Sequence, residues 1–288
     1  MILIIGATGQ LGGQIARQML QDRQDVRILV RPNSPYQPLV EAGAQPVLGD
    51  LKDPLSLAPA LAGIDTVITT ATAGQRGGDD TIERVDLAGN QSLIDAAAQA
   101  GVRQFIFVST IASDPNSPVP IFRAKGAAEA RLRESGIGYT ILQANGFMDV
   151  WIPLIVGLPL QQQRPVVVIG EGRRKHTFVA MQDVASFAVK AVGHSAAHNQ
   201  TIVIGGPQAV SWQDILAAFE TVVEGPIPVE TRTPGEQLPG LPPVVSENMA
   251  YLDTFDSPID MGAATQTFGI KLTPLEAWIR SYLVSMDA

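Results

Sequence analysis

Three glycines near the start of the chain, Gly6, Gly9 and Gly12, have a spacing that suits phosphate binding. They follow the apolar run Met1 to Ile5 and precede an amphipathic stretch, which predicts a turn between a strand and a helix. The first glycine lets the chain turn, the second lets backbone approach a pyrophosphate, and the third lets helix and strand pack closely. The spacing is GxxGxxG and not the commoner GxGxxG, so a purely structural turn is the alternative.

A helix that begins near Gln10 would direct free backbone N–H groups and the positive end of its dipole toward a phosphate. Thr8, Gln10 and Leu11 share this turn with the glycines, and we expect all of them to contact the ligand. The turn lies directly after the first strand of a chain in which strands and helices alternate. That position favours a bound dinucleotide over a structural turn.

The residue at the end of the second strand distinguishes the two nicotinamide cofactors. An acidic residue there would accept the ribose hydroxyls of NAD, whereas an arginine would hold the 2′-phosphate of NADP. Arg31 stands nineteen positions after Gly12, and no acidic residue occurs among the three residues that follow it. A guanidinium forms charge-assisted, bidentate contacts with phosphate, so we predict NADP(H) in preference to NAD(H). The alternative is a solvated arginine at a strand end.

Other strand ends should border the same crevice. Small or polar residues follow the third, fourth, fifth and sixth predicted strands, where a carboxylate could bond the adenine amino group and small side chains could let the cofactor pass. These further cofactor-binding candidates are Asp50, Leu51, Thr70, Ala71, Thr72, Ser109 and Asn145.

The elements that position these residues alternate regularly up to about residue 145. Apolar strands are predicted at residues 1–5, 26–30, 46–48, 66–69, 105–108 and 139–142, and helices at 10–22, 36–42, 54–62, 81–100 and 122–134. Continuously apolar strands separated by helices imply a parallel sheet covered on both faces. The right-handed crossover rule then predicts an α/β fold with a doubly wound parallel sheet of the Rossmann type.

After Asn145 the pattern loosens, and we predict a smaller C-terminal α/β substrate lobe. Strands are predicted at residues 166–169, 178–179 and 201–204, helices at 181–192, 212–223 and 274–284, and proline-rich connectors at 225–228 and 234–243. The expected division is residues 1–150 and 151–288, with the two parts interleaved. We expect Phe147, Met148 and Trp151 to form the apolar wall of a substrate pocket together with Thr110, with core packing as the alternative for the apolar three.

Composition restricts the partners. The 288 residues carry a formal net charge of -8 with a sequence pI near 4.9, which argues against nucleic acid and favours a small-molecule substrate. There is no cysteine, and the three histidines lack metal-ligand spacing, so no metal site is predicted. Met1 already lies in the first strand pattern, so we expect no signal peptide and a cytoplasmic location. The longest apolar stretch, residues 151–160, is too short to form an integral membrane segment.

Several motifs together resemble the atypical short-chain dehydrogenase/reductases. They are GATGQLGG at residues 6–13, VRP at 30–32, GD at 49–50, AGVRQFIFVST at 100–110, SGIGYTILQANGFMD at 135–149 and QDVA at 182–185. More narrowly, the chain resembles the NmrA-like group, which includes quinone and triphenylmethane reductases, isoflavone and phenylcoumaran benzylic ether reductases, and Ycf39-type photosystem assembly factors. The resemblance implies a preference for NADP(H) and leaves the substrate open, because the substrate lobes of the group diverge.

Lys125 is the candidate catalytic residue. Short-chain dehydrogenases usually pair a tyrosine with a lysine four residues later, but Ile121 stands at the tyrosine position here. Resemblance to the isoflavone and benzylic ether reductases implies that Lys125 bonds the nicotinamide ribose and acts as the acid/base, and burial would lower its pKa toward that task. The alternative is that Lys125 only positions the ribose, with water supplying the proton. A hydroxyl such as that of Ser109 could also reach a substrate carbonyl, or could simply cap a loop.

Three functional hypotheses follow. The first is an NADPH-dependent reductase that passes hydride to a small apolar or aromatic acceptor, such as a quinone or an unsaturated ring compound. The second is a non-catalytic NADP(H)-binding redox sensor or assembly scaffold with a protein partner, which the missing tyrosine favours. The third, a sugar-nucleotide epimerase, is disfavoured because that chemistry depends on the same tyrosine.

Overall fold

A computed structural model describes residues 1–74 and 77–286 of the chain, which fold into two compact units. The chain passes between the units several times, first at residues 144–145. The first unit comprises Met1–Ala144, Val184–Val203 and Gln266–Ile270. The second comprises Asn145–Asp183, Ile204–Thr265 and Lys271–Ala288.

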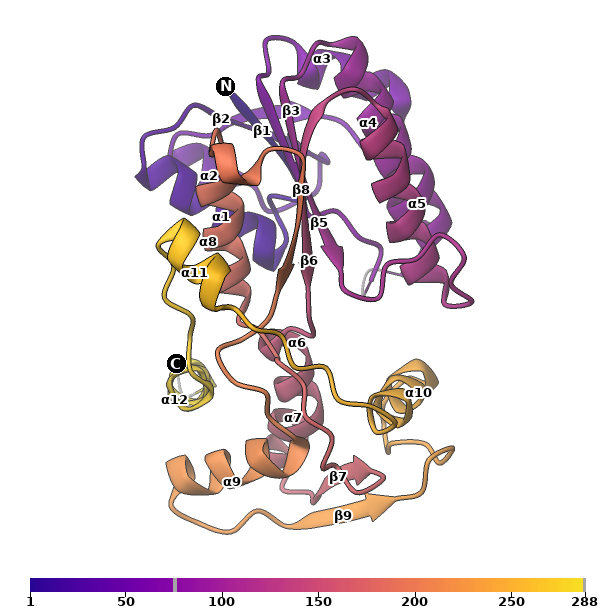
Figure 1. Cartoon of the computed structure of the whole chain (residues 1–288), viewed down its shortest axis with the longest axis vertical. Helices are drawn as coiled ribbons and strands as arrows, with labels where there is room; N and C mark the ends of the chain where they lie inside the picture. Colours follow the sequence, from indigo (N-terminus) through magenta and orange to yellow (C-terminus); the bar gives the residue numbers. More distant parts are fainter. Residues whose placement is uncertain (75–76, 287–288) are drawn as a thin grey trace. The chain divides into compact units, whose positions relative to one another are not determined.

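The first unit is built on a seven-stranded sheet in the order β3-β2-β1-β4-β5-β6-β8 (Figure 1). Every neighbouring pair from β3 to β6 is parallel. The order reverses between β1 and β4, as in the doubly wound folds that bind dinucleotides, and the predicted Rossmann-type α/β fold is confirmed. The strands are β1 (Ile2–Ile5), β2 (Val26–Val30), β3 (Gln45–Leu48), β4 (Thr66–Thr69), β5 (Gln104–Thr110), β6 (Gly138–Ala144) and β8 (Gln200–Ile204).

Helices cover both faces of this sheet, so its central strands β1 and β4 are buried along their whole length. Figure 1 shows α3, α4 and α5 on one face and α1 and α8 on the other. The α-helices of this unit are α1 (Gln10–Gln21), α2 (Gln37–Glu41), α3 (Leu57–Leu61), α4 (Asn90–Gln99), α5 (Pro120–Glu134) and most of α8 (Met181–Ala191). Short 3₁₀ turns occupy η1 (Pro54–Ser56) and η4 (Ser195–Ala197).

The helix predicted at residues 81–100 begins as a wider, π-helical turn, η2 (Ile82–Gly89), before α4. The side-chain amide of Asn90, which is fully buried, donates to the carbonyl oxygens of Val85 (3.2 Å) and Asp86 (3.1 Å). These bonds satisfy carbonyl groups inside the wide turn, where unpaired polar atoms would be costly.

The second unit has a small parallel pair of strands, β7 (Val166–Ile169) and β9 (Val229–Arg232). Its core contains Phe178, Trp212, Ile215, Phe219 and Ile279, all buried. The helical segments are α6 (Met148–Ile152), η3 (Pro153–Gly157), α7 (Leu158–Gln161), α9 (Trp212–Val223), α10 (Pro243–Leu252) and α12 (Leu275–Met286), while α11 (Gly262–Phe268) crosses between units.

Two expectations for this part of the chain were wrong. Residues 178–179 form no strand, since Val179 makes only one bridge to Phe147, and Met148 beyond the bridge turns into α6. The strand predicted at 201–204 is β8, and it joins the central sheet, not the smaller lobe. No helix in the described part of the chain combines the length and apolar character needed to cross a bilayer.

Candidate cofactor site

A pocket of about 480 Å³ lies at the carboxyl ends of β1, β2, β3 and β4 in the first unit. This is the point where the strand order reverses, the usual place for a ligand in an open α/β sheet. Seven of the predicted cofactor-binding residues line it: Gly6, Thr8, Arg31, Asp50, Leu51, Ala71 and Thr72. Asp80 and Val85, which sequence reasoning did not select, line it as well.

The glycine turn at the end of β1 is too tight for side chains. Gly6 has φ +84°, a conformation that favours glycine, and a Cβ added to it would lie 2.6 Å from the Thr70 hydroxyl. A Cβ on Gly12 would lie 2.2 Å from the carbonyl oxygen of Gly6. Gly9 closes the turn by donating its N–H to that carbonyl at 2.9 Å. The first and third glycines therefore let α1 begin against β1.

The first turn of α1 has the character of an anion site. Gly9 caps the helix without a side-chain hydrogen bond, and no acidic side chain occurs in the first turn. The N–H groups at the start of this helix, where Gln10 is exposed and Leu11 buried, therefore keep their capacity to bond an anion. This donor set fits the diphosphate of a dinucleotide.

Two cations, Arg31 and Lys52, meet the carboxylate of Asp80 at the ends of β2 and β3. The Arg31 guanidinium donates from Nη1 to Asp80 Oδ2 at 2.8 Å, and Lys52 donates from Nζ to Asp80 Oδ1 at 2.5 Å. The hydrogen bond from Lys52, together with Arg31, lowers the pKa of Asp80 against the opposing effect of burial. Asp50 lies close by, with its Oδ2 3.7 Å from Lys52 Nζ. The site is thus charged at the place where a 2′-phosphate was predicted.

Lys125, on α5, lies just behind the pocket wall in the first unit. Its Nζ is 3.3 Å from the carbonyl oxygen of Ala71, a pocket residue, and 3.4 Å from Asp86 Oδ1. It also contacts the Val108 carbonyl at 3.4 Å and lies over the Phe107 ring. Burial lowers the pKa of Lys125, while the Asp86 and Glu129 carboxylates act in the opposite direction. Its acid/base role stays a prediction.

Ser109 lies in a buried polar cluster around Glu129, whose Oε1 accepts hydrogen bonds from Ser109 and Ser113, each at 2.5 Å. The amide of Gln143 and the guanidinium of Arg133 also donate to this carboxylate. The hydroxyl proton of Ser109 is therefore already donated to Glu129. Its predicted contact with the cofactor has to come from its hydroxyl oxygen as acceptor or from its backbone.

Five other predicted residues lie at the start of the second unit or at the end of β5. Asn145 is buried and donates its amide to Thr177 Oγ1 at 3.0 Å. Met148 belongs to the second unit's core, Trp151 packs against that core, and Phe147 forms the bridge to Val179. Thr110, half-buried, ends β5 in the first unit. Their roles as nicotinamide and substrate contacts stay predictions.

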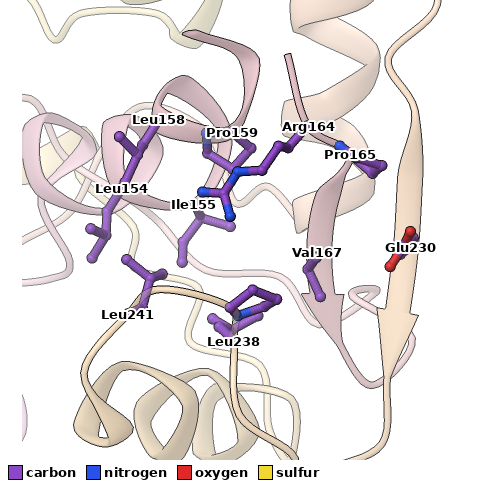
Figure 2. A pocket seen from close by; sticks show the side chains of 11 residues that line it. Leu154, Ile155, Leu158, Pro159, Arg164, Pro165, Val167, Glu230, Leu238 and Leu241 are labelled. Atoms are coloured by element: carbon purple, nitrogen blue, oxygen red, sulfur yellow. The ribbon is translucent and has the colours of Figure 1, made fainter. Parts of the chain in front are cut away.

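The second unit contains its own apolar pocket, which is open to solvent and holds about 620 Å³ of empty space. Its lining comes from η3, α7, β7 and the segment before α10, and the neighbouring residues of the predicted apolar wall are not part of it. In Figure 2 Arg164 extends over the pocket toward Ile155, and Glu230 stands at the edge on β9. The apolar residues labelled there are Leu154, Ile155, Leu158, Pro159, Pro165, Val167, Leu238 and Leu241.

Comparison with known proteins supports the cofactor interpretation. A family model described as NAD(P)H-binding matches residues 6–195. The photosystem II assembly factor Ycf39 of Cyanophora paradoxa is 36% identical over 220 residues, which are 76% of this chain and 67% of that protein. An NAD(P)H azoreductase of Xenophilus azovorans is 29% identical over 227 residues, 79% of this chain and 75% of the azoreductase.

The fold has a close match among solved structures. An NADPH-dependent quinone oxidoreductase from Escherichia coli, complexed with NADPH, superposes with a TM-score of 0.83 at 21% identity, covering 98% of this chain and 100% of that one. At that identity the likeness shows the fold alone. The resemblance to the NmrA-like group of atypical short-chain dehydrogenase/reductases is confirmed by these relatives, and the chain belongs to the NAD(P)H-binding family.

Proposed function

We propose that the protein is an NADPH-dependent reductase that transfers hydride to a small apolar or aromatic acceptor, such as a quinone. The observation that carries the proposal is the pocket at the ends of β1 to β4, with the glycine turn at one side and Arg31 at the other. NADPH supplies a hydride, and the acceptor takes a proton as well.

The chain's own residues bind and orient the cofactor. The N-terminal turn of α1 holds the diphosphate, and Gly6 and Gly12 keep that turn close to β1. Arg31 bonds the 2′-phosphate, with Lys52 beside it through Asp80. Lys125 donates a hydrogen bond to the carbonyl oxygen of Ala71 in the pocket wall, which supports a positioning role for Lys125. The proton for the acceptor comes from water or from the Lys125 ammonium group.

The acceptor class rests on two supports. The second unit lines its pocket mainly with leucine, isoleucine, valine and proline, which favours an apolar ligand over a sugar nucleotide. One relative is an azoreductase and one structural neighbour is a quinone oxidoreductase. The missing tyrosine partner of Lys125 agrees with a reaction that depends on positioning more than on acid/base catalysis.

The test is NADPH oxidation by the purified protein, followed by absorbance, with a quinone, an azo dye and a triphenylmethane dye as acceptors. We expect oxidation that requires an acceptor and is faster with NADPH than with NADH. The variant Arg31→Ala should raise KM for NADPH about tenfold or more and change KM for NADH little, because only NADPH carries the 2′-phosphate. No oxidation across the panel would contradict the proposal.

A second candidate is a non-catalytic NADP(H)-binding sensor or assembly factor, which the relationship to Ycf39 favours. This function predicts different affinities for NADPH and NADP⁺, no turnover, and a stable protein partner recovered with the tagged chain. NADPH oxidation with any acceptor, at a rate that falls in Arg31→Ala, would favour the reductase function over the sensor function.

A further inference from the structure

We propose that Asp80 sets cofactor specificity by competing with the 2′-phosphate of NADPH for Arg31 and Lys52. This inference rests on the proposed function, because it concerns the same pocket. Asp80 does not directly follow a strand and belongs to no recognised motif, so the sequence alone did not indicate this role.

Asp80 joins two basic side chains that come from different strand ends. Its two carboxylate oxygens are divided between them, Oδ2 to Arg31 at 2.8 Å and Oδ1 to Lys52 at 2.5 Å. Arg31 directly follows β2, Lys52 lies in the loop after β3, and Asp80 precedes η2. The carboxylate therefore occupies the point where an anion can reach both cations.

The burial of Asp80 and Lys52 distinguishes this cluster from an ordinary ion pair on the surface. Only 8% of the Asp80 side chain and 14% of the Lys52 side chain are exposed. Arg31 keeps 41% of its side chain exposed and lines the pocket, so it can reach a ligand without unpacking. The hydrogen bonds from both cations lower the pKa of Asp80.

The charges give the direction of the effect. A 2′-phosphate carries about 1.5 to 2 negative charges, and its oxygens accept the same hydrogen bonds that Asp80 accepts now. Asp80 places a negative charge against Arg31 and Lys52, Asp50 adds a second one 3.7 Å from Lys52, and Asp80 repels the phosphate as well. NADH presents a hydroxyl at this position and gains little from either cation, so Asp80 lowers the preference for NADPH over NADH.

The test measures dissociation constants of four probes, NADPH, NADH, adenosine 2′,5′-bisphosphate and adenosine 5′-monophosphate, for the wild-type chain and Asp80→Asn. The control Asp79→Asn changes the net charge equally in the same loop, where Asp79 is exposed with 88% of its side chain accessible. We expect Asp80→Asn to tighten NADPH and the bisphosphate about tenfold and the other two probes no more than about twofold. Asp79→Asn should leave the ratios unchanged.

Asp80→Ser repeats the measurement with a side chain that carries no amide group. Lys52→Gln should weaken binding of adenosine 2′,5′-bisphosphate more than binding of adenosine 5′-monophosphate. Equal shifts for all four probes, or weaker NADPH binding by both folded Asp80 variants, would overturn the inference, because Asp80 would then be an organiser of the two cations and not a competitor. If the wild-type chain binds neither NADPH nor NADH, the proposed function fails. If it binds them and Asp80→Asn leaves their ratio unchanged, only this inference fails.

Discussion

Lys125 and Asp86 place opposite charges inside the first unit, next to the cofactor pocket. Asp86 is fully buried, and its Oδ2 accepts the Ala73 N–H at 2.8 Å while its Oδ1 faces Lys125 at 3.4 Å. Taking either charge out of water alone costs several kcal/mol, and the partner offsets that cost. The two residues should therefore behave as a unit.

Asp86→Asn should lower the free energy of unfolding by about 3 kcal/mol, because it leaves the Lys125 ammonium buried without its counter-charge. Asparagine can still accept the Ala73 N–H, so the loss reports mainly on the charge. In urea unfolding, the double variant with Lys125→Met should lose clearly less than the sum of the two single variants.

The control for this cycle is Asp95→Asn on α4, which breaks the exposed 2.7 Å pair with Arg131 and should cost less than about 1 kcal/mol. Additive losses for Asp86→Asn and Lys125→Met would show that the two buried charges do not interact.

Residues at strand ends could be predicted from the sequence, since the carboxyl ends of parallel strands meet at one edge of a sheet. That argument placed Arg31, Asp50 and Ala71 in the pocket. It could not find Asp80, because its bond to Lys52 joins two loops 28 positions apart, and neither loop has a periodic pattern or a motif. Which charged side chains pair between two loops is determined by the tertiary structure.

At the scale of elements, the junction of β1 and α1 depends on backbone contact. Gly12→Ala should lower the free energy of unfolding by about 3 kcal/mol or more, because the new Cβ would meet the Gly6 carbonyl at 2.2 Å and neither backbone segment can move without displacing the helix. Gly9→Ala is the matched control in the same turn, since its Cβ would lie 3.3 Å from the same oxygen. Thermal unfolding of both variants gives the comparison, and equal losses would contradict this account.

His176 forms hydrogen bonds with the end of α10 and with the segment between α10 and α11, all within the second unit. Its Nδ1 lies 2.7 Å from Ser257 Oγ, and its Nε2 lies 3.0 Å from the Leu252 carbonyl oxygen. Burial lowers the pKa of His176 below its usual 6.5, although the Leu252 carbonyl and the carboxylates of Asp256 and Asp253 act in the opposite direction. The folded chain therefore takes up a proton here less readily than the unfolded chain.

This shift makes stability depend on pH with a defined sign. Above the unfolded pKa of about 6.5 the histidine is neutral in both states, so its contribution is complete. As the pH falls below that value, the unfolded chain binds the proton first and stability is lost. Denaturant unfolding between about pH 5 and pH 8 should show a smaller slope in His176→Gln. A slope in His176→Gln equal to that of the wild-type chain would contradict this account.

Element types were predictable where a buried face imposed a regular pattern, as in β1 and α1. Several elements of the second unit were missed, and for two of them, α10 and β9, the reason can be identified. The prolines before α10 suggested a connector, yet Pro243 stands at the first position of that helix, where its missing N–H costs nothing. β9, with the sequence VETR, is largely exposed and carries no apolar run.

At the scale of the whole molecule, the net charge of -8 opposes an anionic cofactor, so binding depends on local positive charge. In the proposed complex, the helix dipole at α1 would act on the diphosphate that NADPH and NADH share. Arg31 and Lys52 would act on the 2′-phosphate that only NADPH carries. The difference between the two cofactors should therefore respond to salt differently from their common affinity.

Raising the salt concentration should reduce the preference for NADPH. The Debye length falls from about 8 Å at physiological ionic strength to about 3 Å at 1 M, and the partly exposed Arg31 is screened accordingly. We expect the ratio of the NADH to the NADPH dissociation constant to fall severalfold across that range. Arg31→Ala should start from a lower ratio and show a much flatter salt dependence, because the screened contact is gone. A wild-type ratio that does not change with salt would mean that discrimination comes from shape or hydrogen bonds to neutral groups, and Arg31 would then be a solvated side chain at a strand end.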